Sequence, residues 1–174
     1  MLKAKGDLLE VGCGTGRNFD YYTSSVKQIT AVDAAANMVE QAQRKASRLG
    51  SKQRDLITVK QMNAQQLAFP DNSFDTVVDS FGVCSYDNPV SALREMQRVC
   101  RPGGRVLLIE HGRGSYDWIN SVLDDGAVAH AANWGCIWNR DIESVVRSAG
   151  LEVRSVSRFH FGTTYLIEAA PSSK

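Results

Sequence analysis

The segment Asp7–Gly16, DLLEVGCGTG, constrains the fold more than any other part of the chain. Its apolar residues Leu8, Leu9 and Val11 are typical of a strand buried on both faces of a sheet. These residues lead into three glycines at alternate positions, Gly12, Gly14 and Gly16. A glycine-rich turn between a strand and a helix lets a ligand approach the backbone and presents free N–H groups to it. The segment therefore predicts an α/β fold with a ligand site at the end of its first strand.

The glycine spacing argues against two common phosphate-binding turns. A dinucleotide-binding turn has its third glycine three residues after the second, but Arg17 occupies that position. A P-loop needs Gly-Lys-Ser/Thr, which is absent here. Glu10, two residues before the first glycine, would repel a pyrophosphate and suits a cation. The turn therefore favours a nucleoside-like ligand with a positive charge.

A second acidic residue follows the next predicted strand. Residues 29–32 are apolar enough for a buried strand, and the strand ends at Asp33. The number of residues between Gly16 and Asp33 is close to the sequence separation at which an acidic residue meets ribose hydroxyls in nucleotide-binding folds. Two vicinal hydroxyls can donate to the two carboxylate oxygens. The alternative is an aspartate that caps a helix or faces solvent.

Four sequence patterns together resemble the class I S-adenosylmethionine (SAM) methyltransferases of the type 11 family. The order E-x-G-x-G-x-G at residues 10–16 resembles their motif I, and DAAANM at 33–38 resembles their D-x-S-P-x-M run. Residues 63–75 resemble D-A-x-x-L-P-F-x-x-x-S-F-D, with Asn63 in place of the acidic residue. Residues 93–107 resemble the helix and L-x-P-G-G turn before the fifth strand. Their cofactor carries a sulfonium and an ammonium group and no phosphate.

The resemblance implies one Rossmann-like α/β domain over residues 1–174. We expect a seven-stranded, mostly parallel sheet with an antiparallel last strand and helices on both faces. Apolar periodicity predicts a first helix starting at Arg17, a second ending at Gly50, a third capped by Asn88 and a last capped by Asn139. Two alternating stretches around Gly162 predict a final hairpin.

The resemblance also implies which residues bind SAM. Ala34 and Met38 would flank the adenine, and the amide oxygen of Asn63 would accept from its amino group. The end of the fourth strand would meet the methionine part, because ligands of open α/β sheets bind at the carboxyl ends of strands. Met38 as plain core and Asn63 as a turn residue are the alternatives. The complete predicted set is Glu10, Gly12, Cys13, Gly14, Gly16, Asp33, Ala34, Met38, Asn63, Ala64, Ser80 and Phe81.

The region 112–138 holds all three tryptophans, Trp118, Trp134 and Trp138. In similar enzymes the insertion after the fifth strand covers the acceptor site, and aromatic side chains there would enclose an apolar substrate. The alternative is a helix that packs on the sheet. A general base is needed when an oxygen, carbon or thiol acceptor must lose a proton. His111 and Asp79 are the candidate catalytic residues at this edge, unless they only hold loops in place.

Composition limits the partners. The net charge of +1 gives no argument for a nucleic acid or an acidic membrane. The fourth strand ends in neither Asn-Pro-Pro-Tyr nor a Pro-Cys nucleophile, which argues against nucleic-acid bases as acceptors. The four cysteines are widely spaced and form no C-x-x-C pair, so we expect no metal site and no disulfide framework, but reduced thiols in an intracellular compartment, cytoplasmic or mitochondrial.

A closer likeness concerns the segments G-C-G-T-G-R-N-F, C-S, R-P-G-G…E-H and W-G-C-x-W. They resemble a methyltransferase-like group that includes membrane-associated thiol methyltransferases and a mitochondrial inner-membrane relative. The resemblance implies a small, apolar acceptor with a thiol, oxygen or ring carbon, and helices or an anchor before the first strand that this chain lacks. Quinone C-methyltransferases share the cofactor motifs. The alternatives are a non-catalytic SAM-binding assembly protein and a protein or RNA methyltransferase.

Overall fold

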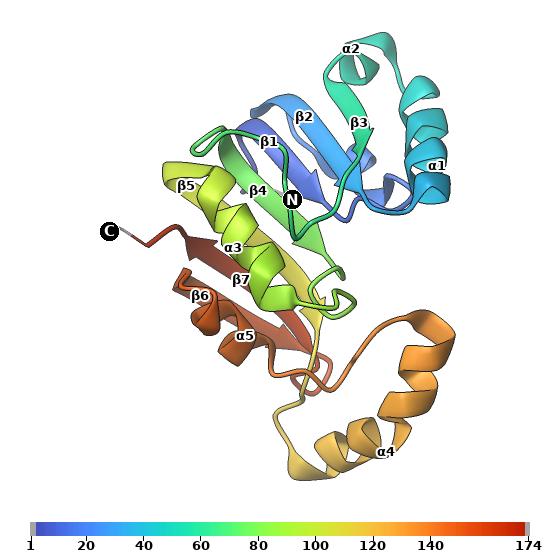
Figure 1. Ribbon diagram of the computed structural model, residues 1–174, viewed down its shortest axis with the longest axis vertical. Coiled ribbons are helices and arrows are strands. Elements are labelled where there is room, and N and C mark those ends of the chain that lie inside the picture. Colours follow the sequence, from blue (N-terminus) through green and yellow to red (C-terminus); the bar gives the residue numbers. More distant parts are fainter. Residues whose placement is uncertain (1–2, 173–174) are drawn as a thin grey trace.

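A computed structural model describes residues 3–172, which form one twisted sheet with helices (Figure 1). The strand order is β3-β2-β1-β4-β5-β7-β6, and β7 alone runs antiparallel to its two neighbours. The strands are β1 (Gly6–Val11), β2 (Val26–Asp33), β3 (Ile57–Gln61), β4 (Phe74–Ser80), β5 (Cys100–His111), β6 (Glu152–Phe159) and β7 (Thr164–Ala170). The predicted seven-stranded sheet with an antiparallel last strand is confirmed.

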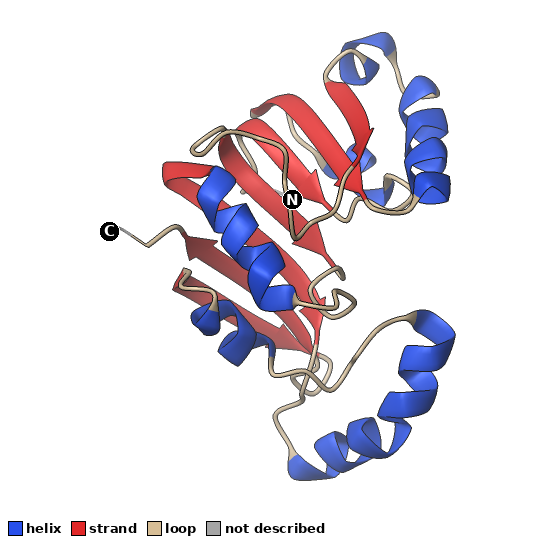
Figure 2. Ribbon diagram, viewed as in Figure 1, coloured by secondary structure: helices blue, strands red, loops and turns tan. Residues whose placement is uncertain are grey.

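Helices cover both faces of the sheet, as predicted (Figure 2). On one face, apolar side chains of α3 (Pro89–Val99) and α5 (Ile142–Ser148) bury Leu93, Met96 and Val146 against the strands. On the other face, α1 (Ala36–Ser47) and the 3₁₀-helix η1 (Arg17–Tyr21) bury Ala42 and Phe19. The short α2 (Ser51–Arg54) leads from α1 into β3. Burying one apolar stripe of each helix on the sheet gives the domain its two cores.

Three local predictions were wrong in detail. The first helix is only the 3₁₀ turn η1, because Val26 already belongs to β2. Gly50 does not end α1 in a left-handed conformation but precedes α2 with φ −57°. Asp141, not Asn139, caps α5, and its carboxylate accepts from the Ser144 N–H at 3.0 Å. The Asn88 cap of α3 is confirmed by the corresponding bond to the Ser91 N–H at 3.0 Å.

The segment after β5 leaves the sheet and forms α4 (Asp117–Trp134), which stands apart from the rest of the fold at the lower right of Figure 1. No residue of α4 is buried. Among residues 3–172, no helix has the length and apolar character needed to cross a bilayer. The parallel strands end at one edge of the sheet, on the side where α4 lies (Figure 1), and ligands of such sheets bind at the carboxyl ends of the strands.

Candidate cofactor and acceptor site

The turn after β1 is shaped by glycines in the left-handed region. Gly12, Gly14 and Gly16 have φ of 64°, 52° and 78°. A Cβ on Gly12 would lie 2.7 Å from the Tyr86 hydroxyl, and one on Gly16 would lie 2.5 Å from the Phe19 ring. A Cβ on Gly14 would meet nothing within 4 Å. Gly14 is therefore the glycine whose backbone is open to a ligand, whereas the other two are packed against the protein.

Asp33 holds this turn in place from the end of β2. Its Oδ2 accepts from the Gly14 N–H at 2.8 Å, and its Oδ1 accepts from the Ala35 N–H at 2.9 Å. The side chain is half-buried. A carboxylate has about four lone-pair sites, so two remain for the vicinal hydroxyls of a ribose. The structure thus brings two predicted site residues together through a direct hydrogen bond.

Glu10 lies beneath the turn and is buried. It accepts from Asn18 Nδ2 at 2.8 Å and from the Tyr22 hydroxyl at 2.9 Å. Burial raises the pKa of Glu10 to about 7, although both hydrogen bonds oppose the shift. Asn18 also donates to Ser80 Oγ at 3.1 Å and so connects the ends of β1 and β4. Sequence reasoning missed Asn18 and Tyr22, although Asn18 lies in the G-T-G-R-N-F segment.

A buried carboxyl pair lies under the loop that follows β4. Asp79 and Glu110 are inaccessible to solvent and hydrogen-bonded to each other. Burial raises the pKa of both carboxyls, and the charge of Asp79 raises the pKa of Glu110 further, so the pair favours holding a proton. Asp79 also accepts from the Gly82 N–H at 2.8 Å and from the Tyr86 hydroxyl at 2.6 Å. Both Asp79 oxygens are therefore engaged within the protein.

The loop itself is fixed from below by Glu110. Its two oxygens accept from the N–H groups of Val83 at 3.3 Å and Cys84 at 3.2 Å. Sequence reasoning predicted Asp79 but overlooked Glu110 and Tyr86. The register of β4 and β5, which places Asp79 opposite Leu108, brings the two acidic residues together only in the folded sheet.

Phe81 and His111 form an aromatic pair at the same edge. Their ring centroids are 4.4 Å apart. Phe81 adopts φ 61°, which is uncommon outside glycine, and 44% of it is exposed. Burial lowers the pKa of His111, and the nearby His130 and His160 lower it further. A strained, exposed aromatic residue beside a neutral imidazole suits a substrate-facing position.

The remaining predicted cofactor residues surround the glycine turn. Gln61 Nε2 donates to the exposed Ala34 carbonyl at 2.9 Å, and Met38 is half-buried at the start of α1. Asn63 is exposed after β3, and its Oδ1 accepts from the Gln65 N–H at 2.9 Å. Cys13, within the turn, and Ala64, after β3, are both buried. Asn63 therefore acts as a turn residue, as the alternative prediction held. Its exposed position after β3 also lets it meet a ligand at the edge of the sheet.

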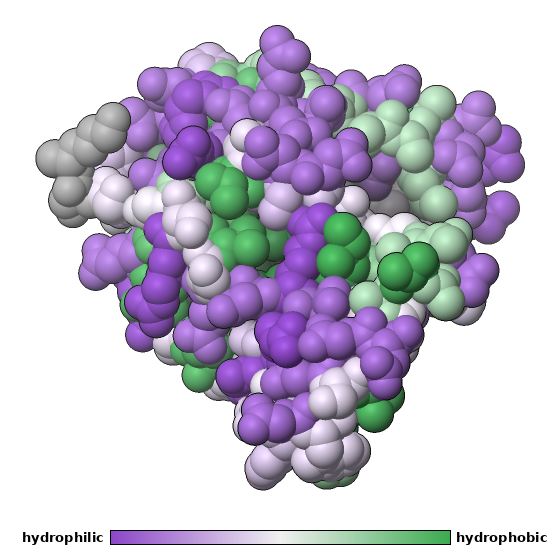
Figure 3. Space-filling model, turned by 60° about the horizontal axis from the view of Figure 1, so that its bottom comes forward, coloured by the Kyte–Doolittle hydropathy of each residue, from purple (hydrophilic) through white to green (hydrophobic). Residues whose placement is uncertain are grey.

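Within the predicted cover, residues 112–138, several side chains contact one another. Trp138 Nε1 donates to the Leu123 carbonyl at 2.8 Å, and its ring stacks on His130 at 3.8 Å. Arg113 holds Asp124 by two hydrogen bonds of 3.0 and 3.1 Å. Trp134 is 76% exposed. On the face turned forward in Figure 3, apolar side chains stand in several places among polar ones. The segment does not pack on the sheet as a core helix would.

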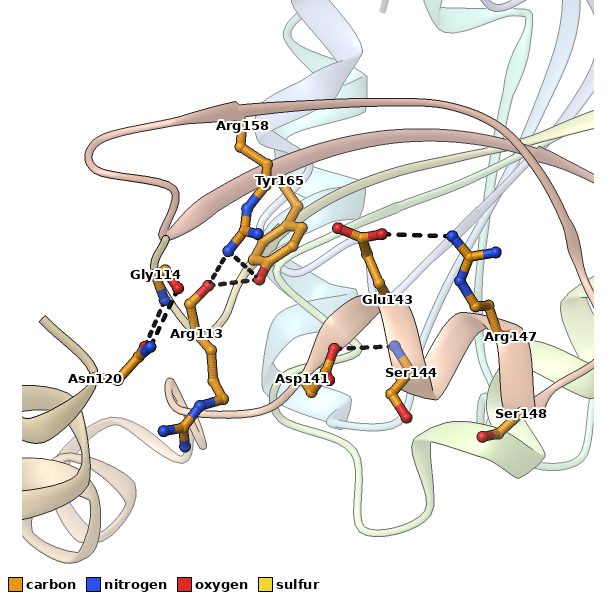
Figure 4. A pocket seen from close by; sticks show the side chains of 10 residues that line it. All are labelled: Arg113, Gly114, Asn120, Asp141, Glu143, Ser144, Arg147, Ser148, Arg158 and Tyr165. Carbon is orange, nitrogen blue, oxygen red and sulfur yellow. Dashed lines mark hydrogen bonds and ion pairs between the residues drawn. The ribbon is translucent and has the colours of Figure 1, made fainter. Parts of the chain in front are cut away.

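A polar groove of about 760 Å³ lies between the start of α4, α5 and the β6–β7 hairpin (Figure 4). Several of its polar residues interact with each other: Arg158 donates to Tyr165 Oη at 2.7 Å, and Arg147 lies 3.6 Å from Glu143. None of the predicted cofactor or catalytic residues lines it. The groove is therefore separate from the site at the glycine turn.

The residues at the turn fit SAM. Gly14 leaves room against the backbone, Asp33 retains acceptor capacity for a ribose, and Glu10 is a buried acid whose ionisation a neighbouring cation would favour. Fold and site together define a class I, Rossmann-like SAM-binding domain.

Comparison with known proteins places the chain within that class. The family model described as a methyltransferase domain matches residues 9–108. The mitochondrial methyltransferase OMS1 of Saccharomyces cerevisiae is 38% identical over 97% of this chain and 39% of its own length. Thiol S-methyltransferase TMT1B of Mus musculus is 39% identical over 60% of this chain and 42% of its own length. The chain belongs to the SAM-dependent methyltransferase domain family.

The solved structures agree on the fold. Geranyl diphosphate methyltransferase in complex with SAM superposes with a TM-score of 0.74, at 16% identity, over 97% of this chain and 73% of that one. At that identity the likeness shows the fold alone. This chain spans about two fifths of the length of the two curated relatives.

Proposed function

We propose that this domain transfers a methyl group from SAM to a small, apolar acceptor, with a thiol as the favoured class. The observation that carries the proposal is that Asp33, which retains acceptor capacity, is hydrogen-bonded to Gly14, a glycine with open space where a side chain would lie. SAM supplies the electrophilic methyl group on its sulfonium. Methyl transfer needs mainly alignment and exclusion of water from the protein.

The residues divide into three tasks. The Gly14 backbone and Asp33 bind the nucleoside part, while the buried Glu10 acts on the cationic amino-acid part through its charge rather than by direct contact. Phe81, exposed at the edge of the sheet, offers an apolar surface beside the acceptor. The name of TMT1B, a thiol S-methyltransferase, supports a thiol acceptor. Residues 112–138 would close over the acceptor with their aromatic side chains.

His111 is the proposed general base. The shift of its pKa below the usual value keeps the imidazole neutral near pH 7, so it can accept the proton that a thiol or hydroxyl loses. Asp79 is proposed to act at a distance. It positions the loop 81–86 through Gly82 and Tyr86, because its oxygens are buried and already hydrogen-bonded.

A ligand-binding and turnover experiment tests the proposal. The domain is first titrated with S-adenosylhomocysteine, and labelled SAM is then offered with a panel of alkyl thiols, phenols and quinones. Transfer to a thiol supports the proposal, and transfer only to a phenol or quinone would replace the acceptor class. Tight cofactor binding without turnover, also in a longer natural chain, would favour a non-catalytic assembly role. Label in protein or RNA fractions of a lysate would favour a macromolecular substrate.

We propose a mitochondrial compartment, as OMS1 is named a mitochondrial methyltransferase. Subcellular fractionation of the natural protein tests this location, and recovery in the cytosolic fraction alone would contradict it.

A further inference from the structure

Two buried cysteines meet where the segment after α4 contacts the loop after β4. The Sγ atoms of Cys84 and Cys136 lie 3.1 Å apart, and both residues are free and buried. The other two cysteines differ. The Sγ atoms of Cys13 and Cys100 each lie 3.8 Å from a backbone carbonyl oxygen and face no second thiol, whereas Cys84 Sγ lies 3.4 Å from the Phe81 carbonyl oxygen and also faces Cys136. Cys84 and Cys136 are thus a thiol pair set apart by geometry.

The backbones around this pair are held together independently of the sulfurs. The Ile137 N–H donates to the Cys84 carbonyl at 2.9 Å. Arg140 donates from Nη1 to the Val83 carbonyl at 3.0 Å and from Nη2 to the Tyr86 carbonyl at 2.8 Å. The thiols therefore stay neighbours without a covalent link, and a movement of about 1 Å would bring them to the roughly 2.05 Å of a disulfide.

We propose that Cys84 and Cys136 form a reversible disulfide that ties the end of α4 to the loop after β4. The oxidant is a small disulfide such as oxidised glutathione. One cysteine thiolate attacks a sulfur of the oxidant and releases one glutathione thiol. The second cysteine then attacks the mixed disulfide, and a second glutathione leaves. Two S–H bonds are lost, one S–S bond forms in the protein, and the oxidant takes up two electrons and two protons.

The closed structure keeps this reaction slow. Burial raises the pKa of Cys84 to about 12, so the thiolate is scarce at neutral pH. Oxidation therefore requires local opening. Such opening is reasonable for α4, because none of its residues is buried and such segments open at low free-energy cost. The bond would then restrain the segment proposed as the acceptor cover, but its formation does not depend on the proposed function.

Mass spectrometry of the folded domain tests the disulfide. The domain is incubated with oxidised glutathione, alkylated under denaturing conditions and digested without reduction. We expect the intact mass to fall by 2 Da before alkylation, and after alkylation a fall from four modified thiols to two and one cross-linked peptide pair containing Cys84 and Cys136. Dithiothreitol should restore all four thiols. Retention of four free thiols, a bridge to Cys13 or Cys100, or a stable glutathione adduct on one cysteine would overturn the proposal.

Variants and dynamics give a second readout. Cys84→Ser and Cys136→Ser should abolish the cross-link, whereas the matched controls Cys13→Ala and Cys100→Ala should keep it. In the unsubstituted chain, oxidation should raise Tm by roughly 5–10 °C, because the bond closes a long loop, and slow hydrogen exchange in α4. An unchanged Tm and unchanged exchange after confirmed bridging would show that the bond restrains nothing. These readouts need no methyl acceptor, so they can fail or succeed separately from the proposed function.

Discussion

The Gly14 N–H donates a 2.8 Å hydrogen bond to the carboxylate of Asp33, which joins the turn after β1 to the end of β2. This one contact sets the shape of the cofactor site, because it orients a glycine that no side chain covers. The two strands are neighbours in the sheet, with Val11 opposite Val32, so the contact follows directly from the strand order. The binding site is therefore a consequence of the fold.

A pair of glycine variants separates binding from folding. Gly14→Ala places a methyl group in open space at φ 52°, so we expect a stability loss of only about 1–2 kcal/mol but at least ~10-fold weaker binding of S-adenosylhomocysteine. Gly16→Ala drives a methyl group toward the Phe19 ring, 2.5 Å away, and should add about 1–3 kcal/mol of overpacking. Calorimetric titration and thermal melts measure both. Unchanged affinity for S-adenosylhomocysteine in Gly14→Ala would contradict the placement of the ligand against the Gly14 backbone.

Glu10 should make ligand affinity depend on pH. The ammonium group of S-adenosylhomocysteine favours ionised Glu10, and burial raises the pKa of Glu10 to about 7, so affinity for this ligand should rise between pH 6 and 8. Titrations at several pH values measure it. Glu10→Gln should bind more weakly and without this dependence. The exposed Glu40, paired with Arg44, provides the control Glu40→Gln, which should behave like the unsubstituted chain.

The same pKa shift predicts a change in stability. The folded pKa of Glu10 lies above the unfolded value of about 4.5, so the native state binds more protons between these values. The contribution of Glu10 to the free energy of unfolding is therefore fully present below about pH 4.5. It is lost as the pH rises to about 7, which lowers the free energy of unfolding by roughly 3 kcal/mol. Denaturant unfolding measures the loss. Glu10→Gln should remove it, and an unchanged pH slope in that variant would contradict the assignment.

Tyr86 should stabilise the loop after β4 through Asp79. Tyr86→Phe removes the 2.6 Å hydrogen bond and leaves a buried carboxylate oxygen without that donor, at a cost of about 1–3 kcal/mol. Thermal unfolding should show a Tm lower by roughly 3–8 °C. Tyr21→Phe, at a side chain 67% exposed, should leave Tm unchanged. Equal melting temperatures for the two variants would show that the Tyr86 hydroxyl does not stabilise the loop after β4.

His111 should matter most for acceptors that hold their proton tightly. His111→Gln should lower kcat/KM by about 10²–10⁴-fold for alkyl thiols of high pKa, and far less for acidic thiols that ionise unaided. The pH profile of the unsubstituted domain should lose activity below the depressed pKa of His111. His160→Asn is the matched histidine control, since Asn tolerates its φ of 53°. The same loss for every thiol would indicate a structural role.

The sheet and the glycine turn could be predicted from the sequence because each depends on local patterns. Residues 8–11 and 29–32 are mostly apolar, and Gly12 to Gly16 fix the turn between a strand and a helix. The contact of Asp79 with Glu110 could not be predicted in this way, because it depends on how β4 and β5 align. The approach of Cys136 to Cys84 depends on the path of the segment after α4.

Asn18 shows a different limit. Its side chain connects Glu10 to Ser80, but a single asparagine after a glycine turn has no periodicity or spacing that distinguishes it from a solvated residue. Asn139 is likewise a residue type that often caps helices, but it lies two residues before the actual cap, Asp141. Its side chain donates to Asp124 at 2.8 Å instead. Most of the site contacts that could not be predicted from the sequence are thus side-chain hydrogen bonds between separate segments of the chain.

Isothermal titration calorimetry with S-adenosylhomocysteine tests the central claim, that the glycine turn and Asp33 hold a cationic nucleoside. We expect one ligand to bind per chain. Its affinity should be at least ~10-fold weaker in Asp33→Asn, which keeps the size of the side chain and one acceptor oxygen. Circular dichroism should show the variant folded. An absence of heat with S-adenosylhomocysteine, together with binding of NAD or ATP, would contradict the account.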